Sequence, residues 1–288
     1  MSIRRLTSSL ALLLLATSSV QAAPALWRVS DADSAIWVFG SVHMLQPDTD
    51  WRSPLLNKIL AKADRIFFET DVGPAAQARI IPLTFELGFN RDGRLLSDKI
   101  GPELTARVRD AAEEYSIPMA SLLTMQPWLA ATTLSIGPLM DSGFEATSGV
   151  ETVLVEEIPL ERQGFLETAE EQLGFLASGS EAEQISMLEA TLDTLHMMQD
   201  DIESMVDAWL AGEPETLGEM FMSQMGDYDQ GMVERIIDQR NHNWVTQIET
   251  MLADNEQVLL VVGAAHMTGD ASVIRLLEDK GFASERLQ

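Results

Sequence analysis

The stretch WVFGSVH at residues 37–43 sets the first expectation for the fold. It runs from a segment rich in aromatic and β-branched residues directly into Gly40 and then His43. Such a segment is typical of a strand, and the glycine lets the backbone turn sharply where the strand ends. A second stretch, LVVGAAH at residues 260–266, repeats this pattern near the other end of the chain. The sequence therefore predicts two strands that each end in a Gly-x-x-His turn.

Strand and helix patterns surround both stretches. Residues 26–29 and 36–39 have strand composition, and the polar residues 30–34 between them predict a hairpin. Two further strands are expected at residues 65–68 and 257–262. Helices are expected at residues 53–63 and 271–280, and Asp270 stands directly before the second as its start signal.

The middle of the chain has helical spacing of apolar residues throughout. Helices are predicted at residues 101–115, 127–140, 184–210 and 231–253. We therefore expect an α/β fold: a small mixed β-sheet core with a large helical insertion at about residues 101–253. No internal repeat or linker divides residues 23–288, so one domain is the simplest interpretation.

Composition and charge exclude several classes of protein. Of the 288 residues, 46% are hydrophobic, which is enough for a sizeable core and excludes a disordered chain. The 19 Lys and Arg against 45 Asp and Glu give a formal net charge of −26, which disfavours nucleic acid as a partner. The chain has no Cys, so any tightly held metal must bind His, Asp or Glu side chains.

Residues 1–22 have the pattern of a secretory signal peptide. Arg4 and Arg5 precede an apolar run at residues 10–16, and small residues stand at Val20 and Ala22. This run is shorter than the roughly 20 residues that span a bilayer, so stable membrane insertion after cleavage is not expected. The mature chain at residues 23–288 is expected in the periplasm or outside the cell.

The two Gly-x-x-His turns suggest a site. Loops that leave the carboxyl ends of strands line the ligand crevice of an open α/β sheet, so His43 and His266 are expected in one pocket. Glu69 follows the strand at residues 65–68. Two imidazoles and a carboxylate suit a divalent metal (Mn, Co, Zn or Fe) with positions left for water. The alternative is that each histidine is a structural polar residue at a strand end.

The remaining histidines and one arginine complete the set of candidates. His196 falls on the polar side of its predicted helix, and His242 has no second ligand nearby. Arg240 lies three residues after Ile237 and four before Trp244, which places it on or beside the buried face of the last long helix. A guanidinium there needs a carboxylate partner or faces an anionic group in a pocket.

A set of short motifs, in this order, resembles the TraB/GumN family. The motifs are WRV at 27–29, FGSVH at 39–43, FETD at 68–71, MQPW at 125–128, GVE at 149–151, LETAEEQ at 166–172, RNHNW at 240–244 and VGAAH at 262–266. The resemblance covers nearly all of the mature chain. It departs from the family at residues 155–164, where a basic residue is expected and Glu156, Glu157 and Glu161 stand instead.

This resemblance implies an α/β core and a set of site residues. The family is related to the Tiki proteases and, more distantly, to the erythromycin esterases. The resemblance implies His43 and His266 as the site imidazoles and Glu69 as an essential carboxylate. It implies Glu151, Glu167 and Arg240 as further polar residues that face the pocket. In the Tiki branch such residues serve a metal-dependent peptidase; in the esterase branch a His acts as general base without metal.

Two classes of function follow from these observations. The leading hypothesis is a peptidase-like hydrolase acting on a peptide or small molecule. In this hypothesis His43, Glu69 and His266 would hold a divalent ion that lowers the pKa of water, Glu151 would accept the proton, and Arg240 would stabilise the oxyanion. The metal-free version is an esterase-like hydrolase with a His as general base.

The competing class is a periplasmic binding protein without turnover, for a peptide or for Cu(I). Thioethers are soft ligands that hold Cu(I), although methionines at helical spacing more often fill a core. Met220, Met222 and Met225 form the tightest group of methionines; the other methionines of the helical region are Met187, Met197, Met198, Met205 and Met232.

Overall fold

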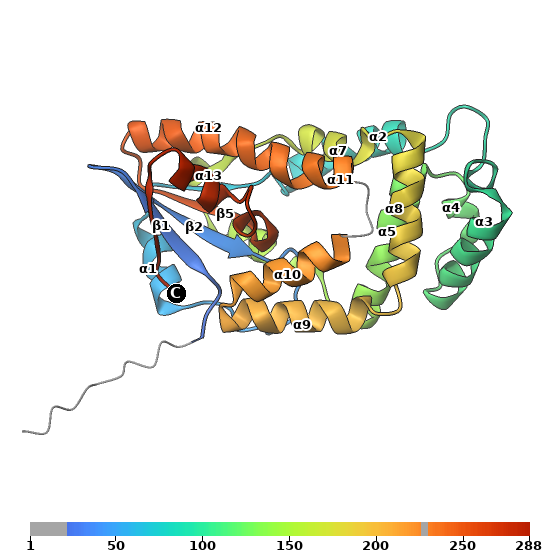
Figure 1. Ribbon diagram of the computed structural model, residues 1–288, viewed down its shortest axis with the longest axis horizontal. Helices are drawn as coiled ribbons and strands as arrows, with labels where there is room; N and C mark the ends of the chain where they lie inside the picture. The colour runs from blue at the N-terminus through green and yellow to red at the C-terminus, as the bar shows by residue number, and fades with distance from the viewer. Residues whose placement is uncertain (1–21, 226–229) are drawn as a thin grey trace, which may run out of the picture.

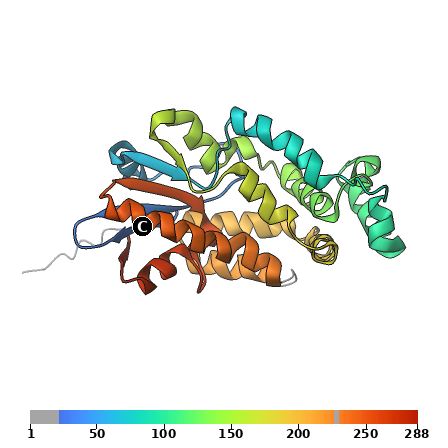
Figure 2. The same cartoon turned by 90° about the horizontal axis from the view of Figure 1, so that it is seen from above.

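The computed structural model describes residues 22–225 and 230–288, and it contains a six-stranded sheet with helices on both faces (Figures 1 and 2). The strands follow the order β4-β3-β5-β2-β1-β6 across the sheet. Their bounds are β1 (Leu26–Ser30), β2 (Ala35–Ser41), β3 (Arg65–Phe68), β4 (Gln163–Phe165), β5 (Val258–Gly263) and β6 (Ala283–Arg286). Strands β4, β3, β5 and β2 are parallel neighbours, whereas β1 pairs antiparallel with β2 and β6.

The helices pack around this sheet and extend away from it. They are α1 (Pro54–Lys62), α2 (Pro74–Gly88), α3 (Leu96–Glu114), α4 (Met119–Leu122), α5 (Pro127–Asp141), α6 (Val150–Glu157), α7 (Ala169–Ala177), α8 (Glu181–Thr194), α9 (Met198–Ala211), α10 (Pro214–Met225), α11 (Gln230–Val233), α12 (Gln239–Ala253) and α13 (Val273–Asp279). Short 3-10 turns are η1 (Ala146–Ser148), η2 (Leu160–Arg162) and η4 (Ala264–Met267), and η3 (Glu234–Asp238) is a π-helical turn.

The sheet is buried on both faces. Alternate residues of β5 separate into two apolar cores, because successive side chains of a strand point to opposite faces. Leu259 and Val261 pack with residues of α1, α6 and α9, whereas Leu260 and Val262 pack with residues of α12 and α13. A third core lies in the distal helices α3, α4, α5 and α8, at the end of the molecule far from the sheet (Figure 1).

The predicted fold class is confirmed: a mixed sheet forms the core and most of the middle of the chain is helical. The hairpin of β1 and β2 also lies where the sequence predicts it. The expectation of a wholly helical middle region is wrong, because β4 inserts there and pairs with β3. This strand has only three residues, and its Gly164 packs directly against the ring of Phe67. So short a strand has no visible period in the sequence.

Three other element predictions need correction. The single helix expected at residues 184–210 is two helices, α8 and α9, because Leu195 packs into the distal core while Val206 and Trp209 pack against the sheet. The last helix begins at Val273 rather than after Asp270, since the Ser272 hydroxyl accepts the Arg275 N–H and caps it. The helix expected at residues 231–253 contains the π-helical turn η3.

Two parts of the chain bear on membrane insertion: the N-terminal segment and the helices of the described residues. The predicted signal peptide at residues 1–22 lies outside the described residues except for Ala22. Among the helices of the described ranges, none is both long and apolar enough to cross a bilayer.

Candidate active site

The carboxyl ends of four parallel strands bring the predicted site residues to one edge of the sheet. Ser41 of β2 is paired with Gly263 of β5, and Phe68 of β3 is paired with Val261 of β5. Glu69, the first residue after β3, therefore lies at the same edge of the sheet as the start of both Gly-x-x-His turns. Beyond β4, the Glu167 N–H donates to the Glu69 carbonyl at 2.9 Å, which places the two glutamates side by side.

Gly263 marks the point at which three predicted site residues converge. A Cβ atom at Gly263 would lie 3.0 Å from Glu69 Oε1, 3.3 Å from His43 Nε2 and 3.6 Å from His266 Cδ2. The Gly263 N–H itself donates to Glu69 Oε1 at 2.6 Å. A glycine here leaves room for the two imidazoles and the carboxylate to face the same small space.

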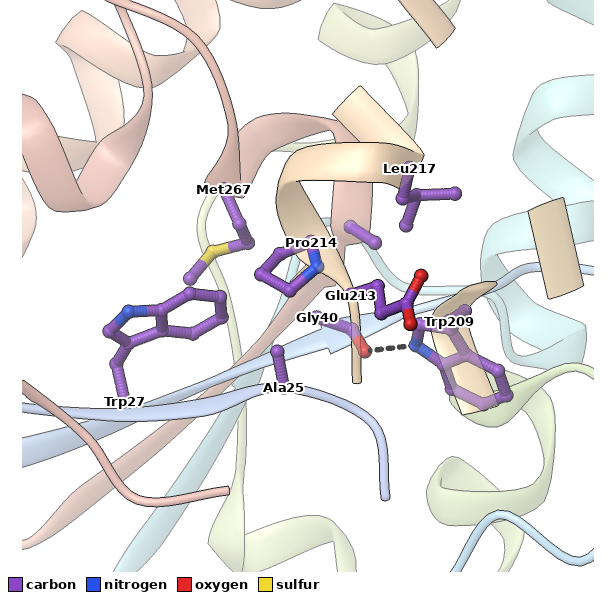
Figure 3. A pocket seen from close by; sticks show the side chains of 9 residues that line it. Ala25, Trp27, Gly40, Trp209, Glu213, Pro214, Leu217 and Met267 are labelled. Atoms are coloured by element: carbon purple, nitrogen blue, oxygen red, sulfur yellow. Dashed lines mark hydrogen bonds between the residues drawn. The ribbon is translucent and has the colours of Figure 1, made fainter. Parts of the chain in front are cut away.

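The first Gly-x-x-His turn is also fixed by contacts of Gly40, the residue at which it begins. Gly40 approaches the backbone of Ala264 so closely that its Cβ would lie 3.3 Å away. Trp209 of α9 donates its indole N–H to the Gly40 carbonyl at 2.8 Å, as Figure 3 shows. The sheet edge, the second turn and α9 are therefore fixed to one another at the base of the site.

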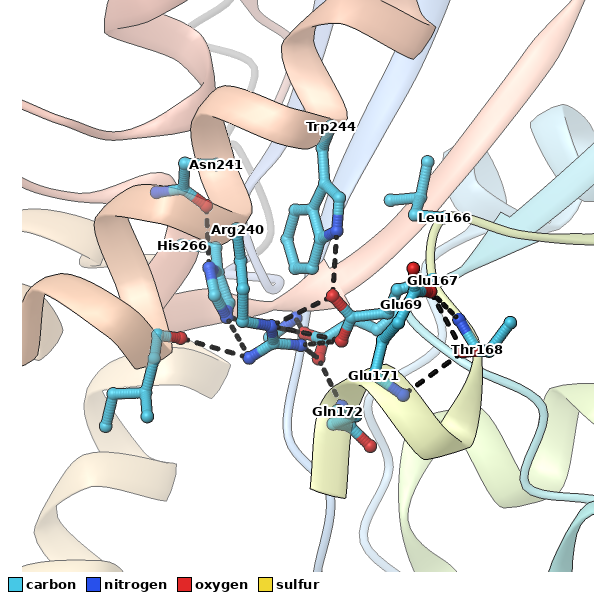
Figure 4. A network of polar contacts seen from close by, with 12 residues as sticks. Glu69, Leu166, Glu167, Thr168, Glu171, Gln172, Arg240, Asn241, Trp244 and His266 are labelled. Atoms are coloured by element: carbon cyan, nitrogen blue, oxygen red, sulfur yellow. Dashed lines mark hydrogen bonds and ion pairs between the residues drawn. The ribbon is translucent and has the colours of Figure 1, made fainter. Parts of the chain in front are cut away.

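Arg240 connects the two glutamates and the second imidazole (Figure 4). Its Nη2 atom donates to Glu69 Oε2 at 2.5 Å and to Glu167 Oε1 at 2.6 Å. Its Nη1 atom lies 3.2 Å from His266 Nε2 and donates to the Ile236 carbonyl at 3.1 Å. This last contact uses a carbonyl of the π-helical turn one helical turn earlier. The guanidinium thus fills the space between the carboxylates and His266.

Other side chains complete the network around the glutamates. Gln172 donates to Glu69 Oε2 at 3.2 Å, and the Trp244 indole N–H donates to Glu167 Oε2 at 3.2 Å. The pKa of the Glu69 carboxyl falls to about 2: burial acts in the opposite direction, but the charges of Arg240 and His43 and the hydrogen bond from the Gly263 N–H outweigh it. Glu69 is therefore a carboxylate throughout the neutral range.

His266 is buried and neutral. Asn241 donates its amide N–H to the Ala271 carbonyl, which turns its Oδ1 toward His266 Nδ1 at 2.7 Å. This network assigns the proton to Nδ1, so the Nε2 lone pair accepts from Arg240. Burial lowers the pKa of His266 to about 3, although Glu69 acts in the opposite direction. His266 therefore acts as a hydrogen-bond acceptor for the guanidinium.

His43 differs from His266 in every respect that matters for proton transfer. Its side chain is 62% exposed, and its Nδ1 lies 3.0 Å from Glu151 Oε1. Ser41 donates its hydroxyl to the same carboxylate oxygen. The Glu151 carboxylate raises the pKa of His43 to about 9. The Nε2 atom of His43 faces the space above Gly263 and has no hydrogen-bond partner among the described residues.

A cavity of about 770 Å³ opens beside these groups. It is lined by five of the six predicted site residues: His43, Glu69, Glu151, Arg240 and His266. Glu167 is not part of its lining and contacts the site through Arg240. The structure therefore brings the predicted residues together, and it gives Glu167 the role of a partner for the arginine rather than that of a pocket residue.

These side chains as they lie do not fit the predicted divalent metal. Within residues 22–225 and 230–288, no group of three or more His, Asp or Glu side chains is arranged to hold a metal ion. The physical reason is Arg240, whose cation occupies the lone pair of His266 Nε2 and one oxygen of Glu69. A second positive charge at the same place would be repelled. The prediction of His43, Glu69 and His266 as a ligand set therefore stays a prediction.

Among the remaining candidates whose side chains are described, Met205 alone lines the cavity. His196 and His242 are exposed, as the sequence predicts for His196. Met187 and Met232 are buried in the distal core, and Met222 is exposed. The side chain of Met225 lies outside the described residues, so copper binding by Met220, Met222 and Met225 stays a hypothesis.

Sequence reasoning missed four polar partners in the site: Ser41, Gln172, Asn241 and Trp244. All four fall within the short motifs quoted above, or next to a residue singled out there. Their position in those motifs was a usable signal. Their hydrogen-bond roles depend on the packing of α6, α7 and α12 against the strand ends.

Fold and site together define a class: an α/β protein whose parallel strand ends present a polar, charged network to a large cavity. The chain belongs to the TraB/PrgY/gumN family, whose model matches residues 25–286. Comparison with curated proteins and with solved structures found no match. The family assignment therefore rests on the sequence motifs and on this match.

Proposed function

We propose that this chain is an exported, metal-independent hydrolase that cleaves an ester or amide bond, with His43 as general base. Export is supported by the signal-peptide pattern of residues 1–22. The single observation that carries the catalytic proposal is the contrast between the two imidazoles. His266 has both ring nitrogens engaged by Asn241 and Arg240, whereas the Nε2 of His43 faces the cavity.

The proposed reaction begins with water above Gly263. His43 Nε2 accepts a proton from this water as it attacks the substrate carbonyl carbon. Glu151, in contact with Nδ1, orients the ring and stabilises the imidazolium that forms. Arg240 lines the cavity together with His43, and its charge partly offsets the charge that develops on the carbonyl oxygen. His43 then returns the proton to the leaving oxygen or nitrogen, which releases an acid and an alcohol or amine.

Glu69, Glu167 and His266 position Arg240 in this scheme. Both carboxylates bind the guanidinium, and His266 accepts one of its N–H groups. Because three partners fix the position of Arg240, its charge is already in place before the reaction begins. Such preorganisation favours stabilisation of a transition state. We propose these three as positioning residues.

The test is hydrolysis of p-nitrophenyl acetate and butyrate by the purified mature chain, before and after treatment with 1,10-phenanthroline and EDTA. We expect activity to survive chelation. The His43→Ala variant is expected to lose about 100-fold or more of kcat, because a positioned general base contributes about 10² to 10⁴.

The matched control is His196→Ala, which removes an exposed imidazole that is not part of the cavity lining and should keep full activity. Circular dichroism checks that both variants fold. Loss of activity on chelation, with recovery on adding Mn²⁺, Co²⁺ or Zn²⁺, would contradict the proposal and favour the metal-dependent peptidase. Full activity in His43→Ala would remove His43 as the base.

A further inference from the structure

The cavity has two chemically different parts. Its charged side chains gather at the strand ends, where His43, Glu69 and Arg240 lie. Helices α5, α9 and α10 and the turn η3 contribute only apolar side chains to the lining. These include Leu139, Ile202, Met205, Phe221 and Ile237, and α7 adds Phe175.

Several of these apolar side chains remain partly exposed although they lie between helices. Ile202, Met205 and Phe221 are all half-buried. Their positions are fixed by other contacts: Trp209 attaches α9 to the sheet, and α5 packs against α8 and α9 (Figure 1). Apolar surface that lines a cavity and stays uncovered in this way is typical of a ligand pocket.

The apolar part selects against polar occupants. The hydroxyl groups of a sugar, or the amide groups of an extended peptide, would lose their hydrogen bonds to water against α5, α9, α10 and η3. A polar group buried without a partner is costly. A hydrocarbon arm has no such groups, and each methylene that leaves water favours binding.

We infer that the substrate is an ester or amide of a long-chain acyl group. Its carbonyl lies at His43 and Arg240, and its hydrocarbon chain lies among the apolar side chains of α5, α9, α10 and η3. This inference rests on the proposed function for the reaction, but the binding of the chain stands on the cavity alone.

Two measurements test the inference separately from the proposed function. The first is kcat/KM for p-nitrophenyl acetate, butyrate, hexanoate and octanoate. The second is calorimetric binding of the neutral alcohols 1-hexanol, 1-octanol and 1-decanol to the wild-type protein and to His43→Ala. Both kcat/KM and alcohol affinity are expected to rise about fourfold per methylene, and alcohol binding is expected to survive in His43→Ala.

A cavity-filling variant locates the binding. In Met205→Trp the indole fills part of the apolar half, so the rise with chain length should stop at a shorter chain. The matched control is Met140→Trp on α5, since Met140 is 66% exposed and does not line the cavity. This control should behave as the wild type does.

The alcohol and ester measurements separate the chain pocket from the proposed hydrolase. Alcohol affinity that does not grow with chain length, or that is unchanged in Met205→Trp, overturns the inference. Ester hydrolysis with no dependence on chain length, or faster cleavage of peptides than of octanoate, also overturns it and leaves the proposed hydrolase intact. Growing alcohol affinity without hydrolysis of any ester supports the chain pocket and removes the proposed function.

Discussion

Arg240 places a positive charge inside the protein and surrounds it with two carboxylates. Its side chain and those of Glu69 and Glu167 are all buried. Taking three charges out of water is costly, and the cost is offset only because the hydrogen bonds among them are short and numerous. Removal of one member leaves the others uncompensated.

We therefore predict that Arg240→Met lowers the free energy of unfolding by about 3 to 5 kcal/mol, the usual effect of breaking a buried ion pair. Urea unfolding followed by circular dichroism measures it. The matched control is Arg107→Met, since Arg107 and Asp193 form an exposed pair, and such pairs contribute about 0 to 1 kcal/mol. Equal losses in the two variants would contradict the buried network.

The pair of His43 and Glu151 gives a prediction about pH. If His43 is the base, it acts only when deprotonated, and its pKa is about 9. Activity should therefore rise as pH increases toward about 9 and level off above it. In Glu151→Gln the carboxylate that raises this pKa is gone, so the rising limb should move toward the ordinary histidine value of about 6.5.

The measurement is the dependence of kcat/KM on pH between 5 and 10 for both proteins. The plateau of Glu151→Gln should also be lower, because the imidazolium loses its partner. An unchanged midpoint in Glu151→Gln would show that Glu151 does not set the titration of the base.

Among single residues, the sequence identified those with an unusual local setting. His43 and His266 follow strands and glycines, and Arg240 falls among apolar helix positions. Their roles were beyond reach, because a role depends on which atom faces which partner. Nothing in the two Gly-x-x-His motifs distinguishes the neutral, engaged His266 from the exposed His43.

At the level of elements, the approach of α6 to the loop after β2 determines where Glu151 meets His43. Val150 donates its N–H to the Val42 carbonyl at 3.1 Å, and Gly149 lies directly against His43. A Cβ at Gly149 would lie 2.0 Å from the His43 carbonyl oxygen, so any other residue must push the helix and the loop apart.

We predict that Gly149→Ala lowers kcat in a protein that still folds. The reason is that the added Cβ separates the base, His43, from its carboxylate partner, Glu151. The control is Gly174→Ala in α7, where a Cβ would meet nothing within 4 Å. That change should raise stability by about 0.5 to 1 kcal/mol and leave kcat unchanged. Thermal unfolding and ester hydrolysis, measured on both variants, test this; wild-type kcat in Gly149→Ala would contradict it.

The elements that the sequence predicted well are those with a long or strong period. The hairpin of β1 and β2 and the helices α1 and α5 fall in that group, as does α12 apart from the π-helical turn that precedes it. The break between α8 and α9 was missed because one apolar stripe serves two different cores. The strands β4 and β6 were missed because one has three residues and the other is largely exposed.

For the whole molecule, the charge balance is the dominant electrostatic feature. The formal net charge is −26, and most of the acidic side chains have no cation to pair with, since 19 Lys and Arg face 45 Asp and Glu. Repulsion among like charges destabilises a compact state, and salt screens it, with a Debye length of about 10 Å at 0.1 M.

The expected result is a higher Tm in 0.5 M NaCl than in 20 mM NaCl at pH 7. Thermal unfolding at several salt concentrations measures the change. Repeating the scans at pH 4.5, where many exposed carboxyls are protonated, should give a smaller dependence on salt. A Tm that falls with salt at pH 7 would mean that attractive ion pairs outweigh the repulsion.

Glu151 and Glu167 were candidates only through the resemblance to the family. The sequence by itself determined the class of fold, the two Gly-x-x-His turns and the unusual position of Arg240. These are local properties: strand composition, helical period and the glycines at strand ends are all written within a few neighbouring positions. Only the tertiary structure decided that Arg240 lies between Glu69, Glu167 and His266, that Glu151 pairs with His43, and that an apolar cavity adjoins them. The physical reason is that a charge finds its partner through the packing of distant elements, and 45 acidic residues in a sequence give no indication of which one that packing brings within reach.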